Sequence, residues 1–184
     1  GRTQKESFES SRWKKCPDSV YRKYSVDKKN PRIATTDGYG YCTIIGNTPL
    51  PLNTVTSWSI KVLKSSGNNG SGIYIGVAPS DIDQNKDYNY SKCGWYFYCY
   101  ESTLYSGPPQ SYKDKAYGPR KEWDGQYVHT GDRVGVVMNT KKGELSFVLN
   151  GVNFGVAYEG IPLDKPLVPC VLLYRKGDSV ELDT

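Results

Sequence analysis

The chain has 184 residues and a net charge of +5, from 24 Lys and Arg against 19 Asp and Glu. That length suits one ordinary domain with a buried core better than two domains. Basic residues alternate with acidic ones, as in Lys113-Asp114-Lys115, so the dense basic stripe of a nucleic-acid-binding domain is missing and no nucleic-acid partner is expected.

Aromatic and turn-forming residues dominate the composition. Sixteen tyrosines and four tryptophans hold much of the apolar surface, and 19 glycines and 11 prolines interrupt the chain throughout. Few stretches remain that are long enough for a stable helix. This composition predicts an all-β fold, either a sandwich or a barrel.

Five cysteines, at positions 16, 42, 93, 99 and 170, cannot all pair with one another. The sequence has no CxxC motif and no Cys/His cluster with metal-ligand spacing, so we expect no metal site and no cofactor. Unpaired thiols indicate a reducing compartment, and we expect an intracellular, cytoplasmic protein. No signal peptide and no apolar run of about 18 residues is present, so neither a membrane span nor a membrane partner is expected.

Residues 1–30 are predicted to be an N-terminal linker or extension, because residues 1–15 are polar and charged, with Phe8 and Trp13 as lone aromatics, and strand signals begin at about residue 31. The folded domain is predicted to span residues 31–184. Since the chain begins at Gly1 rather than at Met, we expect it to be a piece of a longer protein with further domains.

Strand signals follow in chain order from about residue 31. In 56–64, Trp58, Ile60 and Val62 share one face, and a glycine- and asparagine-rich loop joins this segment to 72–79, which predicts a hairpin. Asn150-Gly151 is a strong two-residue turn signal, because both residues tolerate positive φ. Further strands are predicted at 132–140, 143–151, 152–158, 168–174 and 178–182, which makes nine or ten in all. Two stacked sheets are the expected way to bury their apolar faces.

The segment GWYFYCY, residues 94–100, carries five aromatic side chains in seven positions. In an extended strand, Trp95, Phe97 and Cys99 share one face, which we expect to enter the core between the sheets. Tyr96, Tyr98 and Tyr100 share the other face, which we expect to be the outer face, either exposed or covered by a long loop of the same chain.

Catalytic motifs are missing from the sequence. His129 is the only histidine, and it lies in a loop-like stretch without a Ser or Cys partner that any motif identifies. Glu122 and Asp124 offer two carboxylates at i and i+2, but no third acid is nearby, so a glycosidase is not expected. Phosphate-binding glycine loops are also missing. The sequence therefore predicts a protein that is not an enzyme.

Short motifs follow one another in a specific order between residues 57 and 182. They are Trp58-x-Ile60-x-Val62, Gly72-Ile-Tyr-Ile-Gly76-Val77-Ala78, Gly94-Trp95, Tyr117-Gly118, Gly131-Asp132-Arg-Val-Gly135-Val136, Gly143-Glu-Leu145-Ser-Phe147-Val-Leu-Asn150-Gly151, Gly155-Val-Ala157-Tyr158 and Leu167-Val-Pro169. In this combination they resemble the SPRY domain. Upstream, Asp27-Lys-Lys-Asn-Pro31-Arg32-Ile33 resembles the extra N-terminal segment of the longer B30.2 form.

The SPRY resemblance implies a bent β-sandwich of two antiparallel sheets that binds proteins or peptides through loops at one end. Such domains often select substrates in ubiquitin ligases, or act as recognition modules beside RING, B-box or coiled-coil segments. The resemblance further implies that the ligand surface draws on the loop after Gly-Val-Ala, 80–92, and on the loop before the final strand, 174–177.

Three loops carry more Tyr and Arg than solvation requires, and these residue types dominate interaction hot spots. The loops are 80–92, 101–126 and 174–178. We expect one peptide-binding patch whose rim is formed by Tyr88, Tyr90, Tyr174 and Arg175. The full set of candidate partner-binding residues is Tyr88, Tyr90, Tyr174, Arg175, Tyr105 and Arg120.

The sequence therefore predicts a non-catalytic protein–protein interaction module that binds a short peptide or a surface epitope, with substrate recognition in a larger multidomain protein as one role. A lectin-like carbohydrate-binding domain is the alternative, because sugar sites also use Tyr and Trp faces together with Asn and Asp. A purely structural domain of a larger chain is the third interpretation.

Overall fold

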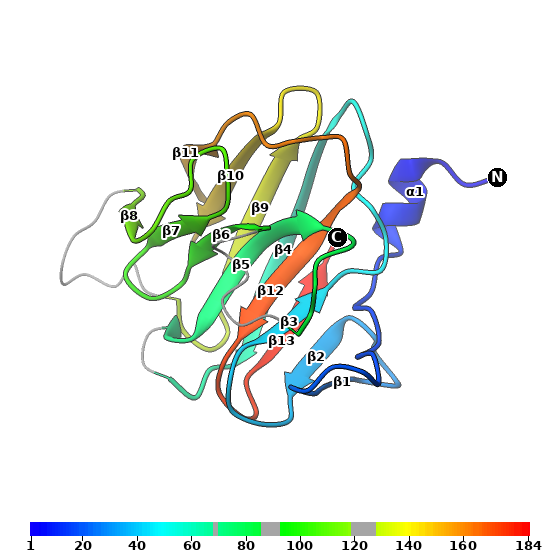
Figure 1. Ribbon diagram of the computed structural model, residues 1–184, viewed down its shortest axis with the longest axis vertical. Helices are drawn as coiled ribbons and strands as arrows, with labels where there is room; N and C mark the ends of the chain where they lie inside the picture. The colour runs from blue at the N-terminus through cyan, green and yellow to red at the C-terminus, as the bar shows by residue number, and fades with distance from the viewer. Residues whose placement is uncertain (68–69, 86–92, 119–127) are drawn as a thin grey trace.

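The computed structural model describes residues 1–67, 70–85, 93–118 and 128–184, and two antiparallel β-sheets packed face to face form its framework (Figure 1). This architecture confirms the predicted all-β bent sandwich. In spatial order, one sheet contains β1 (Tyr24–Val26), β2 (Ile33–Thr36), β13 (Ser179–Asp183), β4 (Val55–Lys64), β9 (Arg133–Asn139), β10 (Glu144–Leu149) and β11 (Val152–Tyr158). The other contains β3 (Cys42–Ile45), β12 (Leu167–Leu173), β5 (Ile73–Pro79), β6 (Trp95–Tyr98), β7 (Thr103–Ser106) and β8 (Lys115–Ala116).

The main hydrophobic core fills the space between the sheets, where the alternating residues of each strand meet. Trp58, Ile60 and Val62 of β4 are buried there, as their spacing predicted. Trp95, Phe97 and Cys99 enter the same core from the opposite sheet, which confirms the expected inner face of residues 94–100. Full burial of one large apolar side chain contributes about 1.5–3 kcal/mol, so this core is the main source of stability.

A second, smaller hydrophobic cluster covers part of the outer face of the six-stranded sheet. Tyr96 belongs to it and is fully buried, with its hydroxyl 3.4 Å from the Cys170 sulfur. Tyr41 and Ile82, from the segments that precede β3 and follow β5, are buried in the same cluster. The outer tyrosines were expected to be either exposed or covered by a loop. In the structure they differ from one another, because Tyr96 is covered whereas Tyr98 and Tyr100 are half-buried.

The predicted hairpin of 56–64 and 72–79 is wrong, because β4 and β5 lie in different sheets. β4 pairs with β9 and β13, whereas β5 pairs with β12 and β6. The intervening loop is long enough to pass from one sheet to the other. Alternation shows which face of a strand is buried, but both sheets bury a face in the same core, so it does not show which sheet the strand joins.

The turn at Asn150-Gly151 is confirmed. Leu149 pairs with Val152 across it, and both turn residues have positive φ, 51° for Asn150 and 79° for Gly151. These angles give the two-residue turn whose twist matches that of the flanking strands. The neighbouring pair, β9 with β10, is also confirmed.

The segment 101–126, predicted as one long connection, contains the two short strands β7 and β8. Among the described residues, the sandwich has thirteen strands rather than nine or ten. Five strands have no counterpart among the predicted ranges, namely β1, β2, β3, β7 and β8. Each is four residues or shorter, and such short runs show little alternation.

The first thirty residues pack against the sandwich. α1 (Gln4–Glu9) begins at the N-cap Thr3, whose side chain accepts a hydrogen bond from the Glu6 amide. Phe8 of this helix packs edge-to-face on Trp58, and Trp13 is buried, with a β-bridge to Gly46. Phe8 and Trp13 are therefore core residues, not lone aromatics of a linker, whereas the division at residue 31 stays a prediction.

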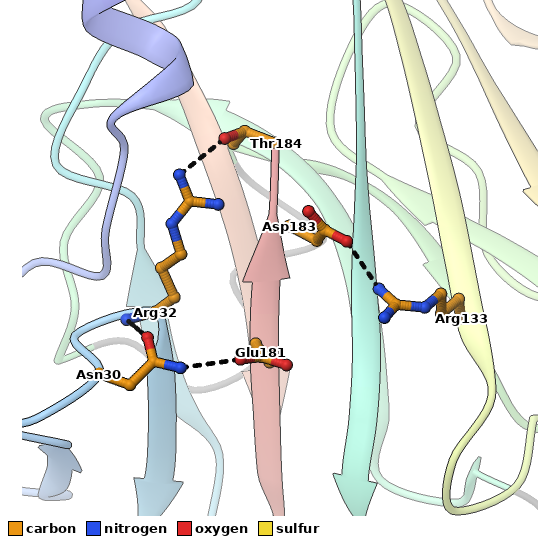
Figure 2. A network of polar contacts seen from close by, with 6 residues as sticks. All are labelled: Asn30, Arg32, Arg133, Glu181, Asp183 and Thr184. Atoms are coloured by element: carbon orange, nitrogen blue, oxygen red, sulfur yellow. Dashed lines mark hydrogen bonds and ion pairs between the residues drawn. The ribbon is translucent and has the colours of Figure 1, made fainter.

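Polar contacts hold this N-terminal segment to the last strand (Figure 2). The Arg32 guanidinium donates to Thr184 Oγ1 at 2.9 Å and to the carbonyl of Glu9, the last residue of α1. Asn30 donates to Glu181 on β13. In the described part of the chain, no helix is long and apolar enough to cross a membrane.

Candidate functional site

Six tyrosines form a contiguous cluster on the outer face of the six-stranded sheet, and we call them the tyrosine cluster. They come from the segment before β3, from β5, β6 and β7, and from the residues just after β6 and β12. The members are Tyr41, Tyr74, Tyr98, Tyr100, Tyr105 and Tyr174.

Tyr74 is the centre of the cluster. Its ring stacks on Tyr98 with centroids 4.2 Å apart, and the rings of Tyr41 and Tyr105 meet it edge-on at 5.6 and 5.4 Å. Tyr74 is buried beneath these neighbours, and this burial raises the pKa of its hydroxyl far above the usual value. The centre is therefore a packed platform, and the rings at its edge are the part that a partner can reach.

Tyr174 lies at the solvent edge of the cluster, with 37% of its surface exposed. Its ring packs edge-on against Tyr41 at 5.0 Å, and the Arg175 guanidinium lies 5.6 Å from its centroid. Arg175 also donates to the carbonyl of Ser71 at 3.2 Å. The two side chains thus hold each other in an ordered, partly exposed position, with a cation–π contact between them.

Three loops meet at Tyr174. The Gly40 amide donates to the carbonyl of Tyr174, and the Tyr174 amide donates to the carbonyl of Gly72. Gly72 has a φ of +85°, and a Cβ there would lie 2.8 Å from an Arg175 nitrogen. The positive φ therefore favours glycine at this position, and a Cβ there would also displace the Arg175 guanidinium.

Asp178 ties the 174–178 turn to the loop after β4. Its side chain is buried, and Oδ1 accepts a hydrogen bond from the Ser66 amide at 2.7 Å. Among the described residues, Oδ2 has no hydrogen-bond partner. Burial raises the pKa of this carboxyl above its usual value, although the hydrogen bonds from Ser66 and the charge of Arg175 act in the opposite direction.

The structure brings together some of the predicted site residues. Tyr174 and Arg175 are in contact, and Tyr105 lies in the same cluster, joined to them through Tyr74 and Tyr41. Tyr88, Tyr90 and Arg120 lie outside the described residues, as do Glu122 and Asp124. Of the four residues of the expected rim, the structure therefore describes Tyr174 and Arg175 but not Tyr88 and Tyr90.

Sequence reasoning missed the contribution of residues 37–41, DGYGY. Tyr41 contacts Tyr174, and Tyr39, two residues earlier, is 70% exposed. The two glycines and two tyrosines of this stretch are the same signal that singled out the other loops.

Of His129, Glu122 and Asp124, only His129 lies in the described part of the chain. The amide of His129 donates to Asp132 Oδ2 at 2.8 Å, and its Nδ1 lies 3.5 Å from the same oxygen in an exposed turn. In the described ranges, no group of three or more His, Cys, Asp or Glu residues is arranged to hold a metal ion.

All five cysteines lie in the described part of the chain, and none of them forms a disulfide. Cys42, Cys99 and Cys170 are buried, and burial raises the pKa of Cys42 to about 11 and that of Cys170 to about 12. Cys16 and Cys93 are only partly buried. The reducing, cytoplasmic location inferred from the cysteines stays a prediction.

Comparisons with known proteins point to one family. The family model described as the SPRY domain matches residues 55–183. The SPRY domain of human HERC1 has a TM-score of 0.65 at 19% identity, over 87% of this chain and 91% of that one. A second human SPRY domain scores 0.64 at 18% identity, over 87% and 94%. The TRIM65 PSpry domain scores 0.61 at 12% identity, over 94% and 92%. No match was found among curated protein sequences.

Proposed function

Because the chain belongs to the SPRY domain family, whose members are commonly non-catalytic interaction modules, we propose that it binds a short peptide or a surface epitope of a partner protein. The contact surface is the exposed edge of the tyrosine cluster together with Arg175 and Tyr39. In a larger multidomain protein, this surface selects the partner on which the other domains act.

The single observation that supports this site best is the ordered exposure of Tyr174 and Arg175. Both side chains are held by ring and hydrogen-bond contacts before any partner arrives, so little conformational entropy is lost on binding. Tyr and Arg are also the residue types with the largest individual contributions at interfaces. Two or three such anchors at about 2 kcal/mol each supply most of the roughly 8 kcal/mol of a micromolar complex.

Tyr105 extends the surface across the cluster, while Tyr88, Tyr90 and Arg120 remain in the proposal on sequence grounds. The loop that contains Tyr88 and Tyr90 follows β5, and Asn85, at its described end, accepts a hydrogen bond from the amide of the exposed Tyr21. That contact supports a continuous surface between this loop and residues 19–22.

A random peptide library displayed on phage tests the proposal. Selected peptides are synthesised with a fluorescent label, and their Kd is measured by polarisation against the wild type and the Tyr174→Ala, Arg175→Ala double variant. We expect a loss of about 100-fold or more in the double variant, from two anchors removed together. The matched control is Lys61→Ala, Arg133→Ala on β4 and β9 of the other sheet, for which we expect an unchanged Kd.

Equal affinity of the wild type and the double variant, with unchanged thermal unfolding, would contradict the proposed site. Because Arg175 also contacts Ser71, a second variant, Tyr174→Phe, Arg175→Lys, keeps the aromatic ring and the positive charge but removes the Tyr174 hydroxyl and the planar guanidinium. Displacement of the peptide by simple monosaccharides would contradict peptide recognition and would favour a carbohydrate site.

A further inference from the structure

A groove lined by cations lies beside the first thirty residues and shares no residue with the tyrosine cluster. Its volume is about 740 Å³, within the usual range of ligand sites. We call it the basic groove. One wall is the segment 12–18 and the other is formed by residues 23–28. The cations of its lining are Arg12, Lys14, Lys15, Lys23 and Lys28, and all five are exposed.

The backbone of the first wall is held rigidly on the sandwich. Trp13 is buried and its amide donates to the carbonyl of Pro31, while the Lys14 amide donates to the carbonyl of Ile45. The carbonyl of Lys14 in turn accepts from the Tyr24 hydroxyl at 2.8 Å. Lys14 and Lys15 therefore project from a backbone that is fixed before a ligand binds, which lowers the entropic cost of binding.

Two of the three carboxylates of the groove contact groups other than these cations, and Lys23 Nζ donates to the carbonyls of Pro17 and Asp18, at 3.3 and 2.7 Å. Asp37 accepts two contacts from the Ser25 hydroxyl, at 2.9 and 3.2 Å, and Asp27 accepts from the Lys29 amide. Within the described ranges, none of the five cations forms an ion pair, whereas Arg133 and Lys165 elsewhere on the surface do, at 2.9 and 3.0 Å. The basic groove thus holds a cluster of cations whose charge is available to a partner.

We propose that the basic groove binds an extended acidic segment of a partner protein, with several Asp or Glu side chains. The groove lining carries five cations and three carboxylates, so its net positive charge complements the negative charge of such a segment. The same lining also carries three carboxylates, those of Asp18, Asp27 and Asp37, which repel the evenly spaced phosphates of a nucleic acid. A peptide carries charges only at its acidic residues, so its carboxylates can lie beside the cations and away from these three groups. This site extends the proposed function, since it is a second contact surface apart from the tyrosine cluster.

The probe is a fluorescein-labelled peptide of alternating Glu and Ser, about twelve residues long and roughly 40 Å when extended. Its polarisation is followed with the wild type, with Lys14→Glu, Lys15→Glu, and with the matched control Lys141→Glu, Lys142→Glu. The control pair is also adjacent and exposed, in the turn between β9 and β10, so both variants change the net charge equally. We expect saturable binding that weakens with salt and falls at least about tenfold in the groove variant only.

An equal loss in both variants would overturn the proposal, because net charge rather than the groove would then account for the binding. No binding to the wild type would also overturn it. A duplex DNA of equal charge is the second probe. If it binds more tightly than the peptide and discriminates between the variants in the same way, the groove is a nucleic-acid site and the proposal is wrong.

Cys16 gives an independent readout of the location, since this partly buried residue belongs to the groove lining. Cys93 is also partly buried but is not part of the lining, so it serves as the internal control. We expect a saturating concentration of the peptide to slow alkylation of Cys16 by iodoacetamide and to leave Cys93 unchanged, as followed by mass spectrometry. An unchanged rate at Cys16 under saturation would place the peptide elsewhere and overturn the assignment.

Discussion

The rings of Tyr74 and Tyr98 stack face to face, with centroids 4.2 Å apart and planes inclined by 12°. The two residues are direct partners in the register of β5 and β6, so the pleat of the sheet places both rings on the same outer face. The Tyr98 hydroxyl accepts a hydrogen bond from the Gly72 amide at 3.3 Å. The stack therefore links the tyrosine cluster to the loop that supports Arg175.

Removal of the Tyr98 ring is expected to destabilise the domain. We expect Tyr98→Ala to lower the free energy of unfolding by about 2–3 kcal/mol, because the ring is half-buried and its stacking adds to its area burial. Tyr98→Phe keeps the ring, and its cost is expected to stay below about 1 kcal/mol. Urea denaturation followed by tryptophan fluorescence gives both values. An equal loss in the two variants would mean that the hydroxyl, not the stack, is the important group.

The Tyr158 hydroxyl connects the two sheets, since it extends from β11 to the carbonyls of Tyr96 and Tyr105, at 2.7 and 3.1 Å. Tyr158 is fully buried, so Tyr158→Phe removes the hydroxyl where water cannot replace it. We expect a loss of about 1–2 kcal/mol in the free energy of unfolding. Tyr21→Phe, at a tyrosine that is 86% exposed, is the control and is expected to have no measurable effect. A neutral Tyr158→Phe would show that these carbonyls need no partner.

Arg32 is expected to hold α1 against the sandwich, because it donates to the carbonyl of Glu9 and to Thr184 Oγ1 (Figure 2). We expect Arg32→Ala to accelerate hydrogen exchange of the α1 amides while exchange in the core strands stays unchanged. Arg133→Ala removes an exposed ion pair with Asp183 and is expected to change the free energy of unfolding by less than about 1 kcal/mol. Unchanged exchange in α1 would show that the burial of Phe8 alone is sufficient to hold the helix.

The raised pKa of Asp178 predicts a pH dependence of stability with a definite sign. Between its unfolded and its folded pKa, the folded state binds more protons, so the contribution of this group to stability falls as the pH rises. This contribution to stability is greatest at pH values below the usual pKa of a carboxyl group. We expect the stability of the wild type relative to Asp178→Asn to increase as the pH is lowered from neutrality, as measured by urea denaturation at several pH values. A difference that does not change with pH would mean that Asp178 has the same pKa in both states.

The alternating strands were predictable from the sequence, because burial of one face imposes a period of two whatever the strand pairs with. Trp58, Ile60 and Val62, and likewise Trp95 and Phe97, lie in the core as predicted. The turn at Asn150-Gly151 was predictable for a local reason, since its conformation depends on those two residues. Tyr174 and Arg175 are neighbours in the chain, so their association at one site was also predictable.

Sheet membership and the cover of the outer face were decided only in the tertiary structure. β4 and β5 bury faces in one core from opposite sheets, and the alternation of apolar residues is the same for either sheet. Tyr96 and Tyr98 have the same side chain and the same strand face, yet only Tyr96 lies fully beneath the cluster that includes Tyr41 and Ile82. Cover of this kind is supplied by segments distant in sequence.

The sequence by itself therefore determined the class of fold, the inner face of each long strand and a pair of contacting residues at the candidate site, since these depend on the local pattern. The tertiary structure decided that Phe8 and Trp13 belong to the core, that Tyr41 completes the contacts of Tyr174, and that five cations share one groove. The physical reason is that the burial of a side chain and the clustering of charges depend on all residues that are close in space. The local sequence pattern shows only those neighbours that are also close in the chain.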